Sequence, residues 1–557
     1  MTTSMHVPSA HVDTFARDRL PPRDQWPDLP FDRPELDYPE RLNVTSALLD
    51  PWLARGWAPR PCLIAATGTW SWGDLAATVD RIAGLLVEEH GLVPGNRVLL
   101  RGPNTPMLAA CWLAVAKAGG IVVATMPLLR AAELTHILEK AEVDLALCDA
   151  RFLEDLSGAR ASVRQGFPVL AFNAANATDS LEARIAGRPA GFAAVDTAAD
   201  DICLIAFTSG TTGRPKATAH FHRDMLAVAD LSPRSQLGVT PDDVFCGSPS
   251  IAFAYGLGGL MLFPLRAGAC SVLIDRPTPE GVLQAIARHK GTVCFTVPTV
   301  YRSMSALIAA GGAPDTGSLR ACVSAGEPLT PSTFDDWKRL TGLPILDTLG
   351  TTELLNAVLA SPPDAIRPGA TGKPVPGYEA TVLDEWGEPL PPGQVGRLAV
   401  RGPTGCRYLD DPRQEGYVVR GWNITGDACH MDEDGYFWHH GRVDDLIVSA
   451  GYKIAGMEIE DALLQHPLVE ECAVIAAPDP IRGAVPKAFL VLRPGTRSGP
   501  ELAREIQDHV KALIAPFKYP RRIEFLEQLP RTETGKIQRF KLRQREWQDA
   551  DTSAAAE

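Results

Sequence analysis

The sequence predicts an α/β protein built on parallel sheets, and three observations support this prediction. Short apolar strand-like runs alternate with amphipathic helical stretches over most of the 557 residues. After about residue 380, turn residues and short strands become frequent, which indicates a compact β region. The last part of the chain has a small α+β pattern. We therefore expect a large N-terminal domain, residues 1–443, made of α/β parallel-sheet subdomains and a small β subdomain, and a small α+β C-terminal domain, residues 444–557.

The elements of the first part follow from hydrophobic periodicity. Strands are expected within residues 97–102, 120–126, 144–150 and 201–210, and helices within residues 105–119 and 131–141. Strand followed by helix, repeated, favours a mostly parallel sheet that helices cover on both faces.

The C-terminal part has its own pattern. A helix ending near Leu463, strands at 472–479 and 487–494, and a helix at 501–513 are expected. In the last helix, Leu502, Ile506, Val510 and Leu513 fall on one face. We place the boundary between the two domains at residues 443–445.

Composition excludes several classes of function. The chain is 45% hydrophobic and 22% charged, which is ordinary for a globular protein. A net charge of −13 argues against a protein that binds nucleic acid through its phosphates. A local cluster of donors can still bind a small anionic ligand against this overall charge.

The sequence predicts a cytoplasmic protein without a membrane partner. Its first residues lack the apolar core of a signal peptide, and the longest apolar stretch is interrupted by Lys117 and Gly119-Gly120. A membrane helix needs about 20 apolar residues. The eleven cysteines include no C-x-x-C pair, which is typical of buried thiols in a reducing compartment.

One loop is rich in groups that bind phosphate. A predicted buried strand, residues 202–207, leads into TSGTTGRPK, residues 208–216. Hydroxyls, glycines, two cations and free backbone N–H groups can together wrap phosphate oxygens. The spacing is neither that of a Walker loop nor that of a dinucleotide-binding fingerprint. A flexible surface linker has the same composition, so these residues alone leave both interpretations open.

This loop resembles the phosphate loop of the adenylate-forming superfamily, which contains acyl- and aryl-CoA synthetases, peptide-synthetase adenylation domains and firefly luciferase. Further motifs that match the superfamily follow in the expected order: SAGEPL (324–329), DTLGTTE (347–353), TGD (425–427), GRVDD (441–445) and RTETGKIQR (531–539). The resemblance covers about residues 200 to 543 and implies a two-step enzyme. A carboxylate attacks the α-phosphorus of ATP and releases pyrophosphate, and a thiol then converts the acyl-adenylate into a thioester and AMP.

The resemblance assigns catalytic roles to Lys536, Thr352 and Glu353. It implies that Lys536 bridges the carboxylate and the α-phosphate, and that Thr352 contacts the α-phosphate. It also implies that Glu353 binds Mg²⁺, which prefers oxygen ligands. Without these motifs, Lys536 would be interpreted as a surface lysine, and Glu353 as a glutamate at a helix start.

The same resemblance implies a nucleotide site. Asp427 would accept hydrogen bonds from both ribose hydroxyls, and Arg442 would support it. Many relatives carry an aromatic residue at the position of Leu349, so apolar contact would replace ring stacking on the adenine. The implied ATP-binding residues are Thr208, Ser209, Gly210, Thr211, Thr212, Gly213, Lys216, Gly326, Glu327, Pro328, Asp347, Thr348, Leu349, Gly350, Thr351, Asp427 and Arg442.

The second half-reaction implies coenzyme A and a mobile C-terminal domain. Asp444 matches the hinge about which that domain rotates in the family. Gly451, followed by Tyr452 and Lys453, matches the element that lines the pantetheine tunnel.

The expected acid pocket contains Phe253, Ala254, Tyr255 and Gly256, together with Ala325. Two rings around small residues form a flat slot rather than a deep alkyl channel. The motifs FAYGLG (253–258) and APFKYPRR (515–522) resemble the benzoate-CoA ligase branch, and HVDTFARDRLPP (11–22) and GYKIAG (451–456) resemble 2-aminobenzoate-CoA ligases. The resemblance therefore implies an ATP-dependent aryl-CoA synthetase for benzoate or 2-aminobenzoate.

Three other functions compete with this prediction. One is a medium-chain acyl-CoA synthetase, which the rings of Phe253 and Tyr255 disfavour. Another is an enzyme that loads an aryl acid onto a carrier protein's phosphopantetheine. The third is a silent nucleotide-binding protein, against which the presence of Lys536, Glu353, Thr352 and Asp427 argues.

Overall fold

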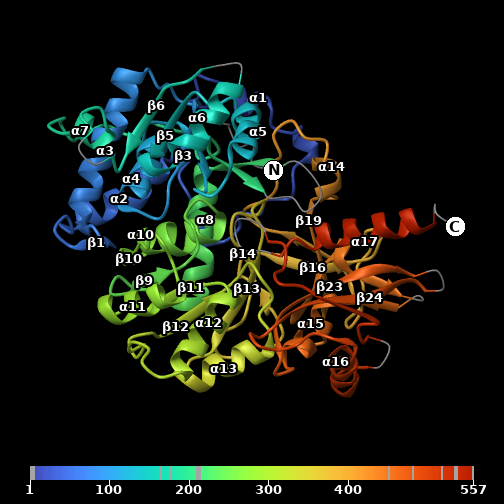
Figure 1. Cartoon of the computed structure of the whole chain (residues 1–557). Helices are drawn as coiled ribbons and strands as arrows, with labels where there is room; N and C mark the ends of the chain where they lie inside the picture. The colour runs from blue at the N-terminus through green and yellow to red at the C-terminus, as the bar shows by residue number, and fades with distance from the viewer. Residues whose placement is uncertain are drawn as a thin grey trace.

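The computed structural model describes residues 7–163, 166–174, 177–208, 215–449, 452–479, 482–515, 518–531 and 537–554. In this part of the chain, two large sheets with helices on their faces are followed by an antiparallel β region and a C-terminal α+β unit (Figure 1). The predicted α/β fold class is therefore confirmed. Figure 1 shows the two large sheets in blue to yellow on one side, and the C-terminal unit in orange and red on the other.

The first large sheet has six strands and carries the start of the candidate phosphate loop. Its strands are parallel except for the last, which runs antiparallel to its neighbour. In spatial order they are β6 (Val169–Phe172), β5 (Leu145–Asp149), β3 (Arg97–Arg101), β4 (Ile121–Thr125), β7 (Ile202–Thr208) and β8 (Lys216–Phe221). The associated helices are α3 (Trp72–His90), α4 (Pro106–Lys117), α5 (Ala131–Ala141), α6 (Leu153–Ser162) and α7 (Leu181–Ile185).

Helix α4 shows why these segments fold as they do. Thr105 caps its first turn by accepting a hydrogen bond from the backbone N–H of Leu108, and Pro106 occupies the first helical position. Every residue of α4 is buried, which explains its almost continuous apolar sequence. The helix shares one hydrophobic core with α2 (Val44–Ala54) and α8 (His222–Ser232), so this core joins both large sheets.

The second large sheet has nine strands. Its central strands β1, β10, β9, β11, β12 and β13 are parallel, and antiparallel strands extend it at both edges. In spatial order they are β15 (Lys373–Pro374), β14 (Ala357–Ala360), β13 (Ile345–Gly350), β12 (Ala321–Ser324), β11 (Val293–Thr296), β9 (Val244–Gly247), β10 (Cys270–Val272), β1 (Pro61–Ala65) and β2 (Gly68–Ser71). The associated helices include α8, α9 (Ala254–Leu257), α10 (Phe263–Ala267), α11 (Pro279–His289), α12 (Pro298–Ala309) and α13 (Pro331–Thr341).

The predicted compact β region is an antiparallel sheet. Its strands are β16 (Glu379–Leu383), β17 (Gly396–Arg401), β18 (Val418–Val419), β19 (Trp422–Met431) and β20 (Phe437–Arg442), with the short helix α14 (Gln414–Tyr417) before β18. A 3₁₀ turn, Val443–Asp445, then leads into the C-terminal unit. This turn coincides with the predicted domain boundary, and the division of the chain there remains a prediction.

The C-terminal unit contains a helix-covered three-stranded sheet and a small hairpin. The hairpin consists of β21 (Ile447–Ser449) and β22 (Tyr452–Ile454), and the sheet of β23 (Val469–Asp479), β24 (Gly483–Leu492) and β25 (Arg522–Phe525). Its helices are α15 (Gly456–Leu464), α16 (Pro500–Leu513) and α17 (Arg539–Ala554). Of the four residues predicted to share one face of α16, Leu502, Ile506 and Val510 are buried, while Leu513, the last residue of the helix, is 46% exposed.

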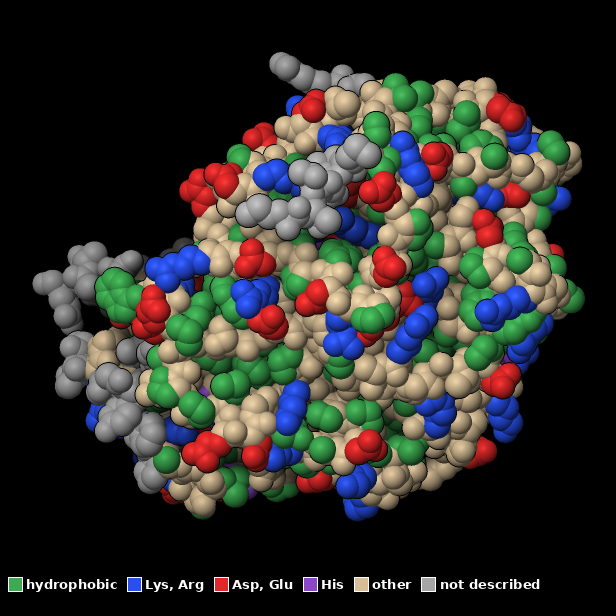
Figure 2. Space-filling view, turned by 180° about the vertical axis from the view of Figure 1, so that it is seen from behind, with side chains coloured by type: hydrophobic (Ala, Val, Ile, Leu, Met, Phe, Trp, Pro, Cys, Tyr) green, Lys and Arg blue, Asp and Glu red, His purple; other side chains and the backbone are tan. Residues whose placement is uncertain are grey.

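The described surface and interior agree with a globular chain. On the face shown in Figure 2, side chains of both charge signs are interspersed with small apolar groups. All eleven cysteines are buried and unpaired. Among the described residues, no helix is both long and apolar enough to cross a membrane.

Candidate active site

The candidate phosphate loop connects two paired strands of the six-stranded sheet. Thr208 at the end of β7 pairs with Lys216 at the start of β8, so the loop between them closes a hairpin. The hydroxyl oxygen of Thr208 is buried and has no hydrogen-bond partner among the described residues. Ser209, Gly210, Thr211, Thr212 and Gly213 lie outside the described residues, so their predicted role stays a prediction.

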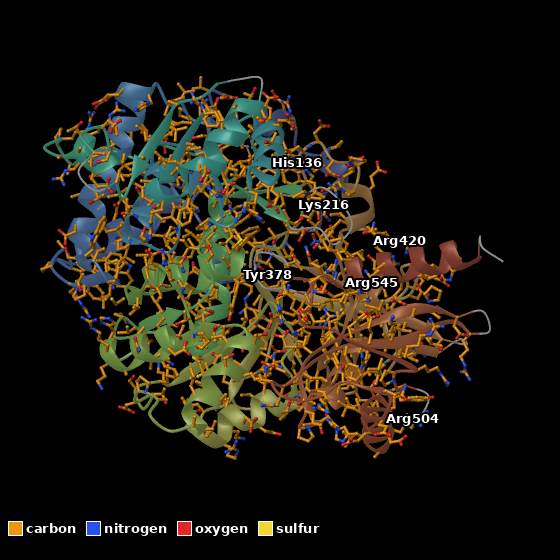
Figure 3. The ribbon with its side chains drawn as sticks, in the orientation of Figure 1. His136, Lys216, Tyr378, Arg420, Arg504 and Arg545 are labelled. Atoms are coloured by element: carbon orange, nitrogen blue, oxygen red, sulfur yellow. The ribbon has the colours of Figure 1, made fainter. Side chains whose placement is uncertain are left out.

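Lys216 faces a carboxylate and two aromatic rings. Its Nζ lies 3.8 Å from Oε1 of Glu353, 4.5 Å from the ring centroid of Tyr408 and 5.5 Å from that of Tyr417. Burial lowers the pKa of Lys216 below its ordinary value, although the charge of Glu353 opposes this effect. Figure 3 shows Lys216 between the six-stranded sheet and the C-terminal unit.

The turn after β13 carries Thr352 and Glu353. The main-chain carbonyl of Thr352 accepts a hydrogen bond from Nε2 of His220 at 2.9 Å, and the buried carboxylate of Glu353 accepts one from the hydroxyl of Tyr408. Gly350 permits the chain to turn here, because a Cβ at this position would lie 2.2 Å from the carbonyl oxygen of Asn356. Two strands distant in sequence, β8 and β13, therefore bring Lys216 and Glu353 together.

This arrangement is chemically suited to a magnesium nucleotide. Glu353 offers a hard carboxylate oxygen. Lys216 and the unpaired Thr208 hydroxyl lie at the same end of the hairpin, where both can donate hydrogen bonds to phosphate oxygens. Within the described ranges, no group of three or more His, Cys, Asp and Glu residues is close enough to hold a metal. A Mg²⁺ bound to Glu353 would therefore take its other ligands from phosphate and water, which is its usual mode beside nucleotides.

The predicted adenine-binding residues lie at the carboxyl ends of β12 and β13. Gly326 has φ +86°, a conformation that favours glycine, and it lies in the turn that follows β12. The side chain of Glu327 accepts hydrogen bonds from the backbone N–H and the hydroxyl of Thr299, so it caps the start of α12. Ala325, Pro328 and Leu349 flank this turn and strand.

Asp347 is a half-buried acid that has no ion-pair partner among the described residues. Its Oδ1 has no hydrogen-bond partner among the described residues, and burial raises its pKa well above the ordinary value. The neighbouring Thr348 donates its hydroxyl proton to the carbonyl of Ser324 at 2.8 Å and thereby joins β13 to β12. The structure thus leaves Asp347 able to pair with a ligand.

Asp427 and Arg442 face each other across paired strands. They are register partners in β19 and β20, and Nη1 of Arg442 lies 3.1 Å from Oδ1 of Asp427. His439 Nε2 lies 3.4 Å from the same oxygen. Burial alone would raise the pKa of Asp427, but His439 and Arg442 outweigh it and lower the pKa to about 2. Asp427 is therefore ionised at neutral pH and is a hydrogen-bond acceptor for a ligand.

The predicted acid-pocket residues surround the start of α9. Gly256 is required there, because a Cβ would lie 2.1 Å from the carbonyl oxygen of Ser250. Tyr255 packs against Phe295 with ring centroids 5.7 Å apart and lines a small cavity, while Phe253 and Ala254 are half-buried. The structure thus brings the predicted aromatic wall close to β12 and β13.

The residues predicted for the second half-reaction are only partly described. Asp444 is exposed in the turn between β20 and β21, and its carbonyl oxygen accepts a hydrogen bond from Arg543 of α17 at 3.2 Å. Tyr452 and Lys453 lie in β22. Gly451 and Lys536 lie outside the described residues.

Known proteins match the chain over nearly its whole length. Residues 52–407 match the AMP-binding enzyme family, and residues 458–536 match the AMP-binding enzyme C-terminal domain. The benzoate–CoA ligase of Thauera aromatica is 36% identical over 516 residues, which cover 92% of this chain and 97% of the relative. The chain belongs to the AMP-binding enzyme family. The predicted superfamily is therefore confirmed.

Two further members of the family are similar to this AMP-binding enzyme. The crystal structure of the anthranilate CoA ligase AuaEII in complex with anthranoyl-AMP superposes with a TM-score of 0.87 at 32% identity, and the match covers 94% of this chain and 100% of that one. The mitochondrial acyl-coenzyme A synthetase ACSM3 of Pongo abelii is 34% identical over 535 residues, 92% of this chain and 91% of the relative. The similarity to the benzoate and anthranilate ligases supports the predicted benzoate-CoA ligase branch.

Sequence reasoning missed four side chains of this AMP-binding enzyme that contact the candidate site. Tyr408 and Tyr417 surround Lys216, His220 supports Thr352, and His439 lies beside Asp427. The only sequence signal was that His220 and His439 lie within four residues of the motifs at 208–216 and 441–445. No local pattern links Tyr408 to Glu353, which is 55 residues away in the sequence.

Proposed function

We propose that the chain is an ATP-dependent aromatic acid–CoA ligase that acts on benzoate or 2-aminobenzoate. The proposed reaction converts the acid, ATP and coenzyme A into aryl-CoA, AMP and pyrophosphate. The observation that carries it is the position of the Tyr255-lined cavity, whose wall includes Thr348 of β13, the strand that leads directly to Thr352 and Glu353. An acid whose ring lay against Tyr255 at the mouth of this cavity would have its carboxylate next to the groups that face the phosphates.

The first half-reaction needs alignment and charge compensation rather than a base. A carboxylic acid with a pKa of about 4 is already ionised at neutral pH. In the proposed mechanism Lys216 and the hydroxyls of the phosphate loop bind phosphate oxygens, and Asp427 accepts the ribose hydroxyls. Lys536, by its resemblance to the family lysine, bridges the carboxylate and the α-phosphate. Bound Mg²⁺, held by Glu353, would neutralise phosphate charge.

The second half-reaction uses the thiol of coenzyme A. In the proposal, residues 444–557 rotate about Asp444, withdraw Lys536 and bring Gly451, Tyr452 and Lys453 to the site. The thiol then attacks the acyl carbon. The bond from this carbon to the bridging oxygen breaks, AMP leaves with that oxygen, and the thioester forms. The contact between Arg543 and Asp444 would have to change during this rotation.

A panel of acids tests the proposed function. Steady-state kcat/KM would be measured for benzoate, 2-aminobenzoate and octanoate with free coenzyme A, and separately with a phosphopantetheinylated carrier protein. The proposal predicts AMP, pyrophosphate and aryl-CoA from an aromatic acid and free coenzyme A. A strong preference for octanoate would favour the medium-chain alternative, which similarity to the ACSM3 synthetase keeps open. Transfer of the aryl group only to the carrier would favour the carrier-loading enzyme. Absence of any turnover with ATP would favour the silent nucleotide-binding protein.

A further inference from the structure

A small cavity extends from the acid pocket into the large domain. Tyr255 forms part of its wall together with Phe295, Val323 and Thr348, and the π-helical turn Pro233–Leu237 closes another side. Its free volume is about that of a single water molecule. An aromatic ring that lies against Tyr255 could therefore extend one small substituent into it, but neither an alkyl chain nor a second ring.

Three of the hydroxyl groups that line this cavity already donate their protons within the protein. Tyr255, Thr348 and Ser361 each donate the hydroxyl proton to a main-chain carbonyl oxygen, at 2.9, 2.8 and 3.3 Å. A hydroxyl has a single proton, so once that proton is donated the oxygen can only accept. These three side chains thus offer lone pairs, and no protons, to a group in the cavity.

The amide of Asn356, which also lines the cavity, makes hydrogen bonds within the protein. Its Nδ2 donates to the carbonyl of Ala254 at 3.1 Å and lies against Gly258, where a Cβ would be only 2.1 Å away. Its Oδ1 accepts a hydrogen bond from the backbone N–H of Ala357 at 2.7 Å. Asn356 therefore uses its Oδ1 and one of the two N–H groups of its Nδ2 to fix the backbone around the cavity.

Gln236 is the one lining side chain among those described whose oxygen is both buried and unpaired. It lies in the π-helical turn after α8, and its Oε1 has no hydrogen-bond partner among the described residues. Native proteins rarely leave a buried amide oxygen unpaired, because its lost hydration is not replaced. An unpaired acceptor beside three hydroxyls whose protons are donated elsewhere points to a ligand that supplies a proton.

We propose that this cavity selects an aromatic acid whose ring carries a hydrogen-bond donor, an amino or a hydroxyl group, and that Gln236 accepts that hydrogen bond. This inference rests on the proposed function and narrows its substrate class. A ring with hydrogen or methyl at the same position would leave Oε1 of Gln236 unpaired. Sites that contain such a polar group discriminate strongly against analogues that lack the matching partner.

The test compares donor acids with methyl analogues of nearly the same size. Wild-type kcat/KM is measured for 2-aminobenzoate against 2-methylbenzoate, and for 3-hydroxybenzoate against 3-methylbenzoate. We expect the donor acid to be preferred by about 10- to 100-fold in at least one pair. In Gln236→Met, which keeps the length of the side chain but removes the acceptor, this ratio should fall to near one.

Controls separate this inference from the proposed function. Gln394→Met makes the same chemical change in an exposed loop, so it should leave the ratio unchanged. Circular dichroism reports whether Gln236→Met is folded, and the wild-type ratios test the inference even if the variant is not. Wild-type ratios near one, or a preference that survives in Gln236→Met, would overturn the inference. Loss of all turnover with aromatic acids would instead overturn the proposed function.

Discussion

The hydroxyl of Tyr408 donates a hydrogen bond to Oε1 of Glu353, and both side chains are buried. Tyr408 lies in a segment that pairs with β8 through Thr218, whereas Glu353 follows β13. The same Oε1 lies 3.8 Å from Nζ of Lys216, whose ammonium also lies over the Tyr408 ring. Tyr408 therefore fixes the distance between the two charged groups that face the candidate phosphate site.

Replacing Tyr408 by Phe should weaken the predicted metal site without removing the ring beneath Lys216. Loss of a hydrogen bond to a metal-ligating carboxylate typically lowers metal affinity or activity about 10- to 100-fold. We expect the rate of pyrophosphate release to fall and the affinity for Mn²⁺, measured by electron paramagnetic resonance with ADP bound, to fall in parallel. Unchanged Mn²⁺ affinity in Tyr408→Phe would contradict a positioning role for this hydroxyl.

Replacing Asp427 by Asn should weaken ATP binding through the ribose. A hydrogen bond to a charged acceptor contributes about 1.5–3 kcal/mol, which corresponds to an increase in KM for ATP of about 10- to 100-fold. Because His439 and Arg442 lower the pKa of Asp427 to about 2, the KM of the wild type should not change between pH 5 and 8 through this group. In the wild type, the KM for 2′-deoxy-ATP should be higher than the KM for ATP, and this difference should be smaller in Asp427→Asn. An equal increase in both proteins would show that Asp427 does not contact the 2′-hydroxyl.

Arg407 and Asp224 form a fully buried ion pair beneath the site. Their closest atoms are 2.8 Å apart, and both side chains are 0% exposed. Removing one partner leaves a buried charge uncompensated, which costs about 3–5 kcal/mol. Arg407→Leu should therefore lower the free energy of unfolding in urea by about that amount.

The exposed ion pair between Arg401 and Glu379 provides a matched control for this prediction. Arg401→Leu should change the free energy of unfolding by less than about 1 kcal/mol, because water and salt screen the charges. If both variants lost the same stability, the contribution of Arg407 would be packing of its side chain rather than its charge.

The buried His222 and the half-buried His440 should make the fold sensitive to mild acid. Burial lowers the pKa of His222 from 6.5 to about 3, and burial together with His430, His439 and Lys518 lowers that of His440 to about 4. The unfolded chain then binds more protons below pH 6.5, so stability falls as the pH decreases through this window and is fully present above it. At pH 5 each histidine should cost about 2 kcal/mol.

Urea unfolding between pH 5 and 7.5 measures this effect. His440→Gln removes one of these groups and should reduce the loss of stability between pH 7.5 and 5 by about 2 kcal/mol. A profile that is flat from pH 7 to 5 in the wild type would contradict the prediction.

Individual helices and strands could be predicted because the sequence patterns that specify them lie within the elements themselves and their flanking residues. Helix α5 occupies the predicted residues 131–141, and β3 and β7 lie within the predicted ranges, since apolar periodicity and flanking turn residues specify each of them. Periodicity alone does not show that Leu513 is exposed, because the apolar spacing of α16 continues to the last residue of the helix.

Contacts between distant segments could not be predicted from one sequence. Nothing in the first forty residues signals that Ala10 and Arg17 hydrogen-bond to the buried carboxylate of Asp201, or that the N-terminal segment packs there. Likewise, the motifs placed Glu353 near phosphate, but its hydrogen bond with Tyr408 depends on how two sheets meet. Gln236 gave no signal because its burial depends on the π-helical turn that follows α8.

The most direct measurement separates the two proposed half-reactions. Lys536→Ala would be assayed for pyrophosphate release from ATP and 2-aminobenzoate, and separately for aryl-CoA formation from chemically prepared 2-aminobenzoyl-AMP and coenzyme A. If Lys536 compensates charge only during adenylation, the first rate should fall at least about 100-fold, as when a preorganised charge is removed from a transition state, and the second should stay close to that of the wild type. Equal losses in both half-reactions would contradict a mechanism in which the C-terminal domain supplies this cation for the first step alone.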